Sequence, residues 1–66
     1  MDRLDLLRYI RLVIKSYPSL EDECLSLLEL CMDDLSEGDF ARTCYERAYN
    51  SIKELIEENG YAPINI

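Results

Sequence analysis

Apolar residues recur at helical spacing in three segments of this 66-residue chain, and two turn signals separate the segments. The first segment covers about residues 3–16 and ends at Tyr17-Pro18, since the residue before a proline is pushed out of the helical region. The second and third segments cover about residues 20–35 and 40–58. The pattern therefore predicts three amphipathic helices.

Residues with known capping preferences stand near the predicted helix ends. We expect Ser19 to cap the second helix, with Asp22 three residues later in place of the Glu or Gln of a capping box. Ser36 or Asp39 is expected to cap the third helix. Gly60 is expected to end that helix in the left-handed conformation.

Short connections between the three helices predict antiparallel neighbours, so the expected fold is a small all-α three-helix bundle. Residues 1–66 then form a single domain, with residues 60–66 as a short C-terminal tail. The tail has two open interpretations, because it either folds back over the bundle or reaches into a neighbouring molecule. In an alternative arrangement, two helices pack together and the first associates elsewhere. Because the chain begins with methionine and carries no visible tag, we expect a complete small gene product.

Each predicted helix has one apolar face that is expected to contribute to a shared core. The core residues are predicted to be Leu6, Leu7, Ile10, Val13, Ile14 and Tyr17, then Leu20, Cys24, Leu27, Leu28, Cys31 and Leu35, then Ala41, Cys44, Tyr45, Ala48, Tyr49, Ile52, Leu55 and Ile56. Further apolar or aromatic positions lie at or beyond the edges of these faces: Leu4, Tyr9, Leu12, Leu25, Leu30 and Met32. A chain this short has more apolar surface than its core needs, which favours a second interface and makes a homodimer an expected state.

Charge is distributed unevenly along the chain, which has a formal net charge of −7. Residues 1–18 carry four bases and two acids, residues 19–40 carry eight acids and no base, and residues 41–66 carry three bases and four acids. The net negative charge therefore belongs mainly to the second helix and the loop that follows it.

Helical geometry gathers these charges into two outward faces of opposite sign. The basic face lies on the first helix and consists of Arg8, Arg11 and Lys15. The acidic face lies on the second helix and consists of Asp22, Glu29 and Asp33. One interpretation is that both faces are ordinary solvated surface. Another is that the acidic face docks onto a basic surface of a larger protein. A third is that the carboxylates imitate the phosphates of a nucleic acid.

The residue types present favour a binding protein over an enzyme. The chain has no histidine, which removes the commonest general base and the commonest metal ligand. Cys24, Cys31 and Cys44 fall on predicted core faces and lack the paired spacing of a zinc site. We therefore expect no catalytic residue, no cofactor and no metal.

The same composition bears on where the protein is located and on whether it binds nucleic acid directly. No apolar run approaches the about 18 to 20 residues that span a bilayer, so we expect no membrane partner. Three cysteines on helical faces do not suggest a disulfide framework, which favours a cytoplasmic protein with reduced thiols. An acidic chain lacks the basic footprint that direct contact with nucleic acid requires.

We therefore predict a small acidic helical protein that binds a larger macromolecule and modulates it, as an inhibitor, adaptor or transcriptional co-regulator. Its expected partner-binding residues are Asp22, Glu29, Asp33, Tyr9, Leu12 and Leu30. A nucleic-acid mimic and a structural homodimer are the alternatives. Compact acidic proteins of this kind are common among phages and mobile elements, which suggests such a source by analogy.

Overall fold

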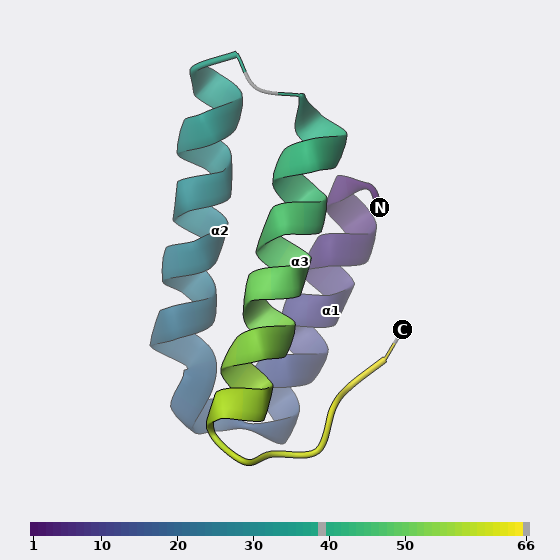
Figure 1. Ribbon diagram of the computed structural model, residues 1–66, viewed down its shortest axis with the longest axis vertical. Helices are drawn as coiled ribbons and strands as arrows, with labels where there is room; N and C mark the ends of the chain where they lie inside the picture. Colours follow the sequence, from purple (N-terminus) through teal and green to yellow (C-terminus); the bar gives the residue numbers. More distant parts are fainter. Residues whose placement is uncertain (39, 66) are drawn as a thin grey trace.

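Three α-helices make up most of the chain in the computed structural model, which describes residues 1–38 and 40–65. Helix α1 spans Arg3–Ser16, α2 spans Glu21–Ser36 and α3 spans Ala41–Glu58, and the 3-10 turn η1 (Pro18–Leu20) joins α1 to α2. Figure 1 shows successive helices running in opposite directions, side by side. The predicted three-helix bundle is confirmed, and each helix end lies within one residue of its predicted position.

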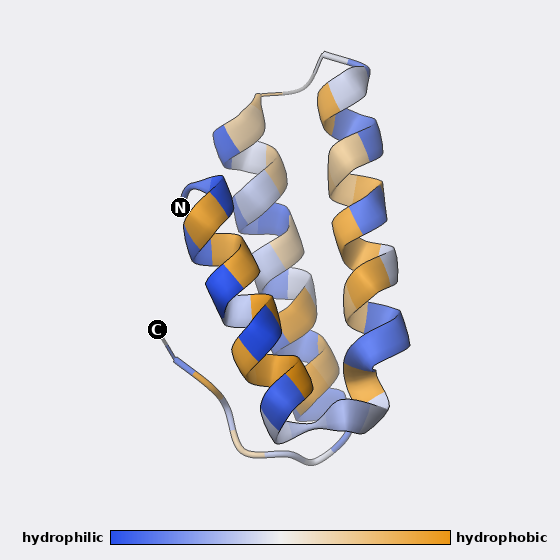
Figure 2. Cartoon of the chain, turned by 180° about the vertical axis from the view of Figure 1, so that it is seen from behind, coloured by the Kyte–Doolittle hydropathy of each residue, from blue (hydrophilic) through white to orange (hydrophobic). Residues whose placement is uncertain are grey.

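Helix α1 packs against both α2 and α3. It lies behind the other two helices in Figure 1 and in front of them in Figure 2, which shows the opposite side. The alternative arrangement, in which the first helix associates elsewhere, is therefore wrong. Figure 2 also shows hydrophobic and hydrophilic residues alternating around each helix. Across residues 1–38 and 40–65, none of the helices is both long and apolar enough to cross a membrane.

The helix caps differ from those that the sequence predicts. The side chain of Asp2 caps α1, because the Asp5 backbone N–H donates to Asp2 Oδ1 at 2.9 Å. Ser19 lies inside η1, and α2 begins after Leu20 without a side-chain cap, so the predicted capping box is wrong. The proline-initiated turn already has helical character where it meets α2, which leaves Ser19 no extended backbone from which to cap.

The third helix also begins without a side-chain cap. Its N-cap residue is Phe40, whose backbone is extended. Ser36 is the last residue of α2, and its hydroxyl donates to the Asp33 carbonyl oxygen at 2.7 Å. Asp39, the other predicted cap, lies outside the described residues. Gly38 has a φ of +102°, which explains the glycine in this connection.

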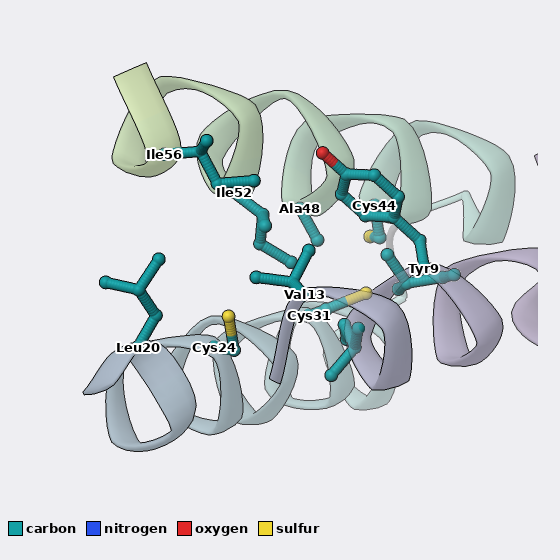
Figure 3. Close-up of a cluster of buried hydrophobic side chains, with 11 residues drawn as sticks. Tyr9, Val13, Leu20, Cys24, Cys31, Cys44, Ala48, Ile52 and Ile56 are labelled. Atoms are coloured by element: carbon teal, nitrogen blue, oxygen red, sulfur yellow. The ribbon is translucent and has the colours of Figure 1, made fainter. Parts of the chain in front are cut away.

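The core lies along the common axis of the three helices (Figure 3). Its buried residues are Leu6, Tyr9, Ile10, Val13, Leu20, Cys24, Cys31, Cys44, Ala48, Ile52 and Ile56. Nine further predicted core residues are partly buried against it or beside it, whereas Ala41 is exposed. The apolar periodicity therefore predicts most of the core correctly.

Tyr9 is the main departure from the predicted core. The sequence predicts it at the edge of its helix face, but it is 0% exposed, so that placement is wrong. Its predicted role in partner binding is untested and would require the ring to leave the core. Because α1 packs against two helices, its buried arc is wider than a single apolar stripe. The ring of Tyr9 lies 4.5 Å, centroid to centroid, from the ring of Tyr49 on α3. Its hydroxyl is buried and has no hydrogen-bond partner among the described residues.

The C-terminal tail folds back onto the bundle. Gly60 has a φ of +73°, and the backbone N–H groups of Gly60 and Tyr61 donate to the carbonyls of Glu57 and Ile56, which forms a Schellman motif. The Tyr61 ring then stacks on Tyr17 with centroids 4.4 Å apart. The Tyr17 hydroxyl donates to the Ala62 carbonyl oxygen at 2.8 Å, and Ile64 packs against the core.

We expect Tyr9→Phe to stabilise the fold. The substitution keeps the ring and removes a buried hydroxyl that has no partner, a group whose burial costs about 1–3 kcal/mol. The free energy of unfolding, measured by urea denaturation, should rise by about 1 kcal/mol. Tyr45→Phe, at a half-buried position, is the control and should change little. A clear loss of stability in Tyr9→Phe would show that the hydroxyl is hydrogen-bonded in solution.

The same residue should make stability depend on pH in the alkaline range. Burial, followed by the neighbouring Tyr49 and Cys24, raises the pKa of Tyr9 from 10.0 to about 12. As the pH rises, the unfolded chain therefore loses the Tyr9 proton before the folded chain does. The stability associated with the protonated hydroxyl is intact below about pH 10 and is lost toward about pH 12. The stability difference between Tyr9→Phe and the unmodified protein should therefore grow across that window in urea titrations. A difference that stays constant with pH would contradict the prediction.

Candidate functional site

A groove follows the contact between α2 and α3. Its larger part has a volume of about 370 Å³ and lies between the N-terminal half of α2 and the C-terminal half of α3. A smaller part of about 140 Å³ continues toward the other ends of these helices. Leu27 and Ser51 line both parts, which makes the groove continuous. Its described lining residues all come from α2 and α3, so the groove opens on the side of the pair that α1 does not cover.

The larger part of the groove has an apolar floor and an acidic rim. Leu27 and Leu55 are half-buried and form the floor. The rim consists of exposed carboxylates from both helices: Asp22, Glu23, Glu54 and Glu58. None of the described residues that line this part is basic. We call this part the acidic groove. It offers a cationic, amphipathic ligand both charge pairing and apolar contact.

The smaller part of the groove is closer to electrical neutrality. Asp34 of α2 accepts a hydrogen bond from Arg47 Nη1 of α3 at 2.9 Å, which links the two helices across the groove. Leu30 lines this part and is 59% exposed. The groove is therefore polarised, with carboxylates and no described basic residue in the lining at one end, and an ion pair beside an exposed leucine at the other.

A second surface lies on the outward side of α1. Arg8, Arg11, Leu12 and Lys15 line a shallow depression there. Leu12 is 42% exposed, and Leu4, on the same side of the helix, is 63% exposed. We call these five residues the basic α1 face. Because α1 lies between this face and the other helices, the basic α1 face and the acidic groove are on opposite sides of the bundle (Figures 1 and 2).

The structure distributes the predicted partner-binding residues over several surfaces. Asp22 lies on the rim of the acidic groove, and Leu30 lines the neutral part of the groove. Glu29 and Asp33 are exposed on α2 but are not among the residues that line the groove. Leu12 belongs to the basic α1 face on the opposite side. The predicted set therefore does not form one binding surface.

Three acidic residues of the groove are not among the binding residues that the sequence predicts: Glu23, Glu54 and Glu58. In the sequence, Glu54 and Glu58 contribute only to the charge of the third helix, and the apolar pattern predicts Leu27 and Leu55 in the core. One signal was available, because Glu54 and Glu58 stand four residues apart on one helix face, where like charges repel. That repulsion indicates an acidic groove only when the structure shows that α2 places further carboxylates opposite Glu54 and Glu58.

The cysteines are packing residues in this fold. Cys24, Cys31 and Cys44 are each at most 3% exposed, and no disulfide joins them in the part of the chain described. Burial raises the pKa of the Cys24 and Cys31 thiols, with Glu23 adding to the effect at Cys24 and Cys44 at Cys31. Among the described residues, no three His, Cys, Asp or Glu side chains are placed to hold a metal ion.

Comparison with models of known protein families, with curated proteins and with solved structures finds no match for this chain. Interpretation of the groove therefore depends on its own geometry and charge.

We expect the native thiols to react slowly with the disulfide reagent DTNB. The thiolate is the reactive form, and burial both raises the pKa and blocks access. Reaction in buffer should be at least about a hundredfold slower than in denaturant at the same pH, because it must wait for local or global opening. Thr43→Cys, at an exposed position in the first turn of α3 and away from the acidic groove, is the control and should add one fast-reacting thiol. A native cysteine that reacts as fast as the control would contradict the burial of that thiol.

Proposed function

We propose that this chain is a non-enzymatic helical protein that binds a larger protein and modulates it, as an inhibitor, adaptor or transcriptional co-regulator. The binding surface is the groove between α2 and α3, and the ligand is a basic amphipathic helix of the partner. The observation that carries this proposal is the acidic groove itself, where four carboxylates surround two leucines without a basic residue among the described lining.

The groove has the form that suits helix-in-groove recognition, in which the apolar face of one helix lies between two others. Leu27 and Leu55 provide apolar contact, and the small side chains of Ser26 and Ser51 leave room for close approach. From Asp22 to Asp34 the groove follows α2 for about 18 Å, at 1.5 Å per residue, which matches about three turns of a partner helix. A helix in this position would complete a four-helix arrangement.

The apolar floor favours a protein ligand over the nucleic-acid-mimic alternative. A mimic presents charges to a phosphate-binding site and has no need for leucines between them. In the acidic groove, Leu27 and Leu55 are half-buried and still accessible between the carboxylates. An amphipathic helix uses both features, since its cations pair at the rim and its apolar residues contact the floor. A cytoplasmic location accords with this proposal and with three unlinked thiols.

The proposal is tested with a synthetic helical peptide of about three to four turns that carries leucines on one face and lysines and arginines beside them. Binding is measured by fluorescence anisotropy on the purified protein. Glu54→Lys/Glu58→Lys should weaken binding at least about tenfold, or about 1.4 kcal/mol. Glu29→Lys/Asp33→Lys changes the net charge equally outside the groove and should weaken it much less.

A peptide of the same composition with its leucines scattered around the helix serves as the ligand control. It should bind weakly, and its binding should disappear steeply with added salt, whereas the amphipathic peptide should retain affinity from its apolar contacts. Equal loss of binding in the two charge-reversal variants would contradict the groove proposal. Loss only in Glu29→Lys/Asp33→Lys would instead assign binding to the outward acidic face of α2.

A further inference from the structure

The chain itself contains a helix with the properties that the acidic groove is expected to bind. The basic α1 face presents exposed Leu4 and Leu12 beside Arg8, Arg11 and Lys15. This combination of apolar side chains flanked by cations is complementary to the two leucines and four carboxylates of the acidic groove. Within one molecule the two surfaces cannot meet, because they lie on opposite sides of the bundle.

Both surfaces are concentrated at the same end of the molecule. Helix α1 ends where α2 begins and where α3 ends, at the bottom of Figure 1. The three bases of the basic α1 face lie from the middle of α1 to its C-terminal end, and the acidic groove lies beside the start of α2 and the end of α3. A second copy shifted sideways without rotation therefore brings the basic α1 face over the acidic groove of the first.

The lengths of the two surfaces also match. Arg8 to Lys15 covers seven residue steps of α1, and Ser51 to Glu58 covers seven steps of α3, which is about 10 Å in each helix. Leu4, nearer the start of α1, would then lie toward the neutral part of the groove, where Leu30 is exposed. Charged and apolar positions thus meet their counterparts in the same register.

We propose that a second copy of this chain occupies the acidic groove with its basic α1 face, so that copies associate head to tail. Each copy then offers one groove and one α1 face, on opposite sides. A contact between two different surfaces does not close into a twofold dimer, and when the copies are related by a shift it continues as an open row. The assembly therefore grows with protein concentration, beyond two copies.

Head-to-tail association would affect the proposed function. This effect rests on the proposed function, whereas the association itself does not. The basic α1 face would cover the groove that a partner helix needs, so self-association and partner binding would compete. The protein would then be most available to a partner when it is dilute. The net charge of −7 opposes the association of copies, so we expect it to be weak and to need high concentration.

The test measures the average mass of the purified full chain by sedimentation equilibrium, from about 10 μM to about 1 mM, the range of weak affinities. We expect the mass to rise from 7.7 kDa past the mass of two copies without a plateau. The α1 variant Arg8→Glu/Arg11→Glu and the groove variant Glu54→Lys/Glu58→Lys should each associate at least about tenfold more weakly. All four substituted side chains are exposed, so the variants should fold, which circular dichroism checks.

Matched controls distinguish the effect of each surface on association from the effect of net charge. Glu29→Lys/Asp33→Lys has the net charge of the groove variant, and Arg3→Glu/Arg42→Glu has that of the α1 variant. Both controls leave the two surfaces intact and should still associate. Mixing the α1 variant with the groove variant should restore association, since each reversed surface then finds one of opposite charge.

Three results would overturn the proposal: a chain that stays at 7.7 kDa throughout, a mass that stops at two copies, or a mixture of the two variants that does not associate. These measurements involve no partner peptide. Peptide binding is measured at concentrations where the chain is monomeric, so failure of self-association and failure of the proposed function are distinguished.

Discussion

The packing of α1 across the α2–α3 pair is the contact on which the rest of the structure depends. Two amphipathic helices cannot bury their apolar faces alone, and α1 covers one side of the pair with Leu6, Tyr9, Ile10 and Val13. A third helix can cover only one of the two grooves between α2 and α3. The other groove therefore stays open, and it is there that Leu27 and Leu55 remain accessible. The tail reinforces the same arrangement, because Tyr61 stacks on Tyr17 at the end of α1.

The charged residues are distributed differently on the side of the α2–α3 pair that α1 covers and on the open side. The side that α1 covers contains no charged buried residue among those described, and the open side collects carboxylates from two helices around the floor of the groove. Arg8, Arg11 and Lys15 of α1 lie on the outward side of that helix, away from both the core and the groove. This separation of opposite charges onto opposite sides gives a small acidic protein a strong polarity. Such polarity selects the orientation of whatever docks on either side.

A single groove would then serve two ligands of the same chemistry. The proposed partner helix and the α1 helix of another copy would both present apolar residues flanked by cations, so they would compete for the same carboxylates and leucines. The balance between them is set by concentration and by the number of charge pairs each forms. Long-range repulsion between copies of net charge −7 favours the partner whenever the protein is dilute.

Helical periodicity was sufficient to predict the helices to within one residue, the order of the bundle, the turn at Gly60 and most of the core. These features are local, because spacing along one helix decides which side is apolar. The caps were predicted poorly, since η1 changes the backbone on which Ser19 would have acted.

What only the tertiary structure decided is how the faces of different helices combine. The burial of Tyr9 follows from α1 contacting two neighbours, and the acidic groove joins Asp22 and Glu23 of α2 to Glu54 and Glu58 of α3. Residues about thirty positions apart share no periodicity that a single helix could reveal. The sequence by itself determined which residues are apolar or charged on each helix, and the packing of the helices decided which of them meet.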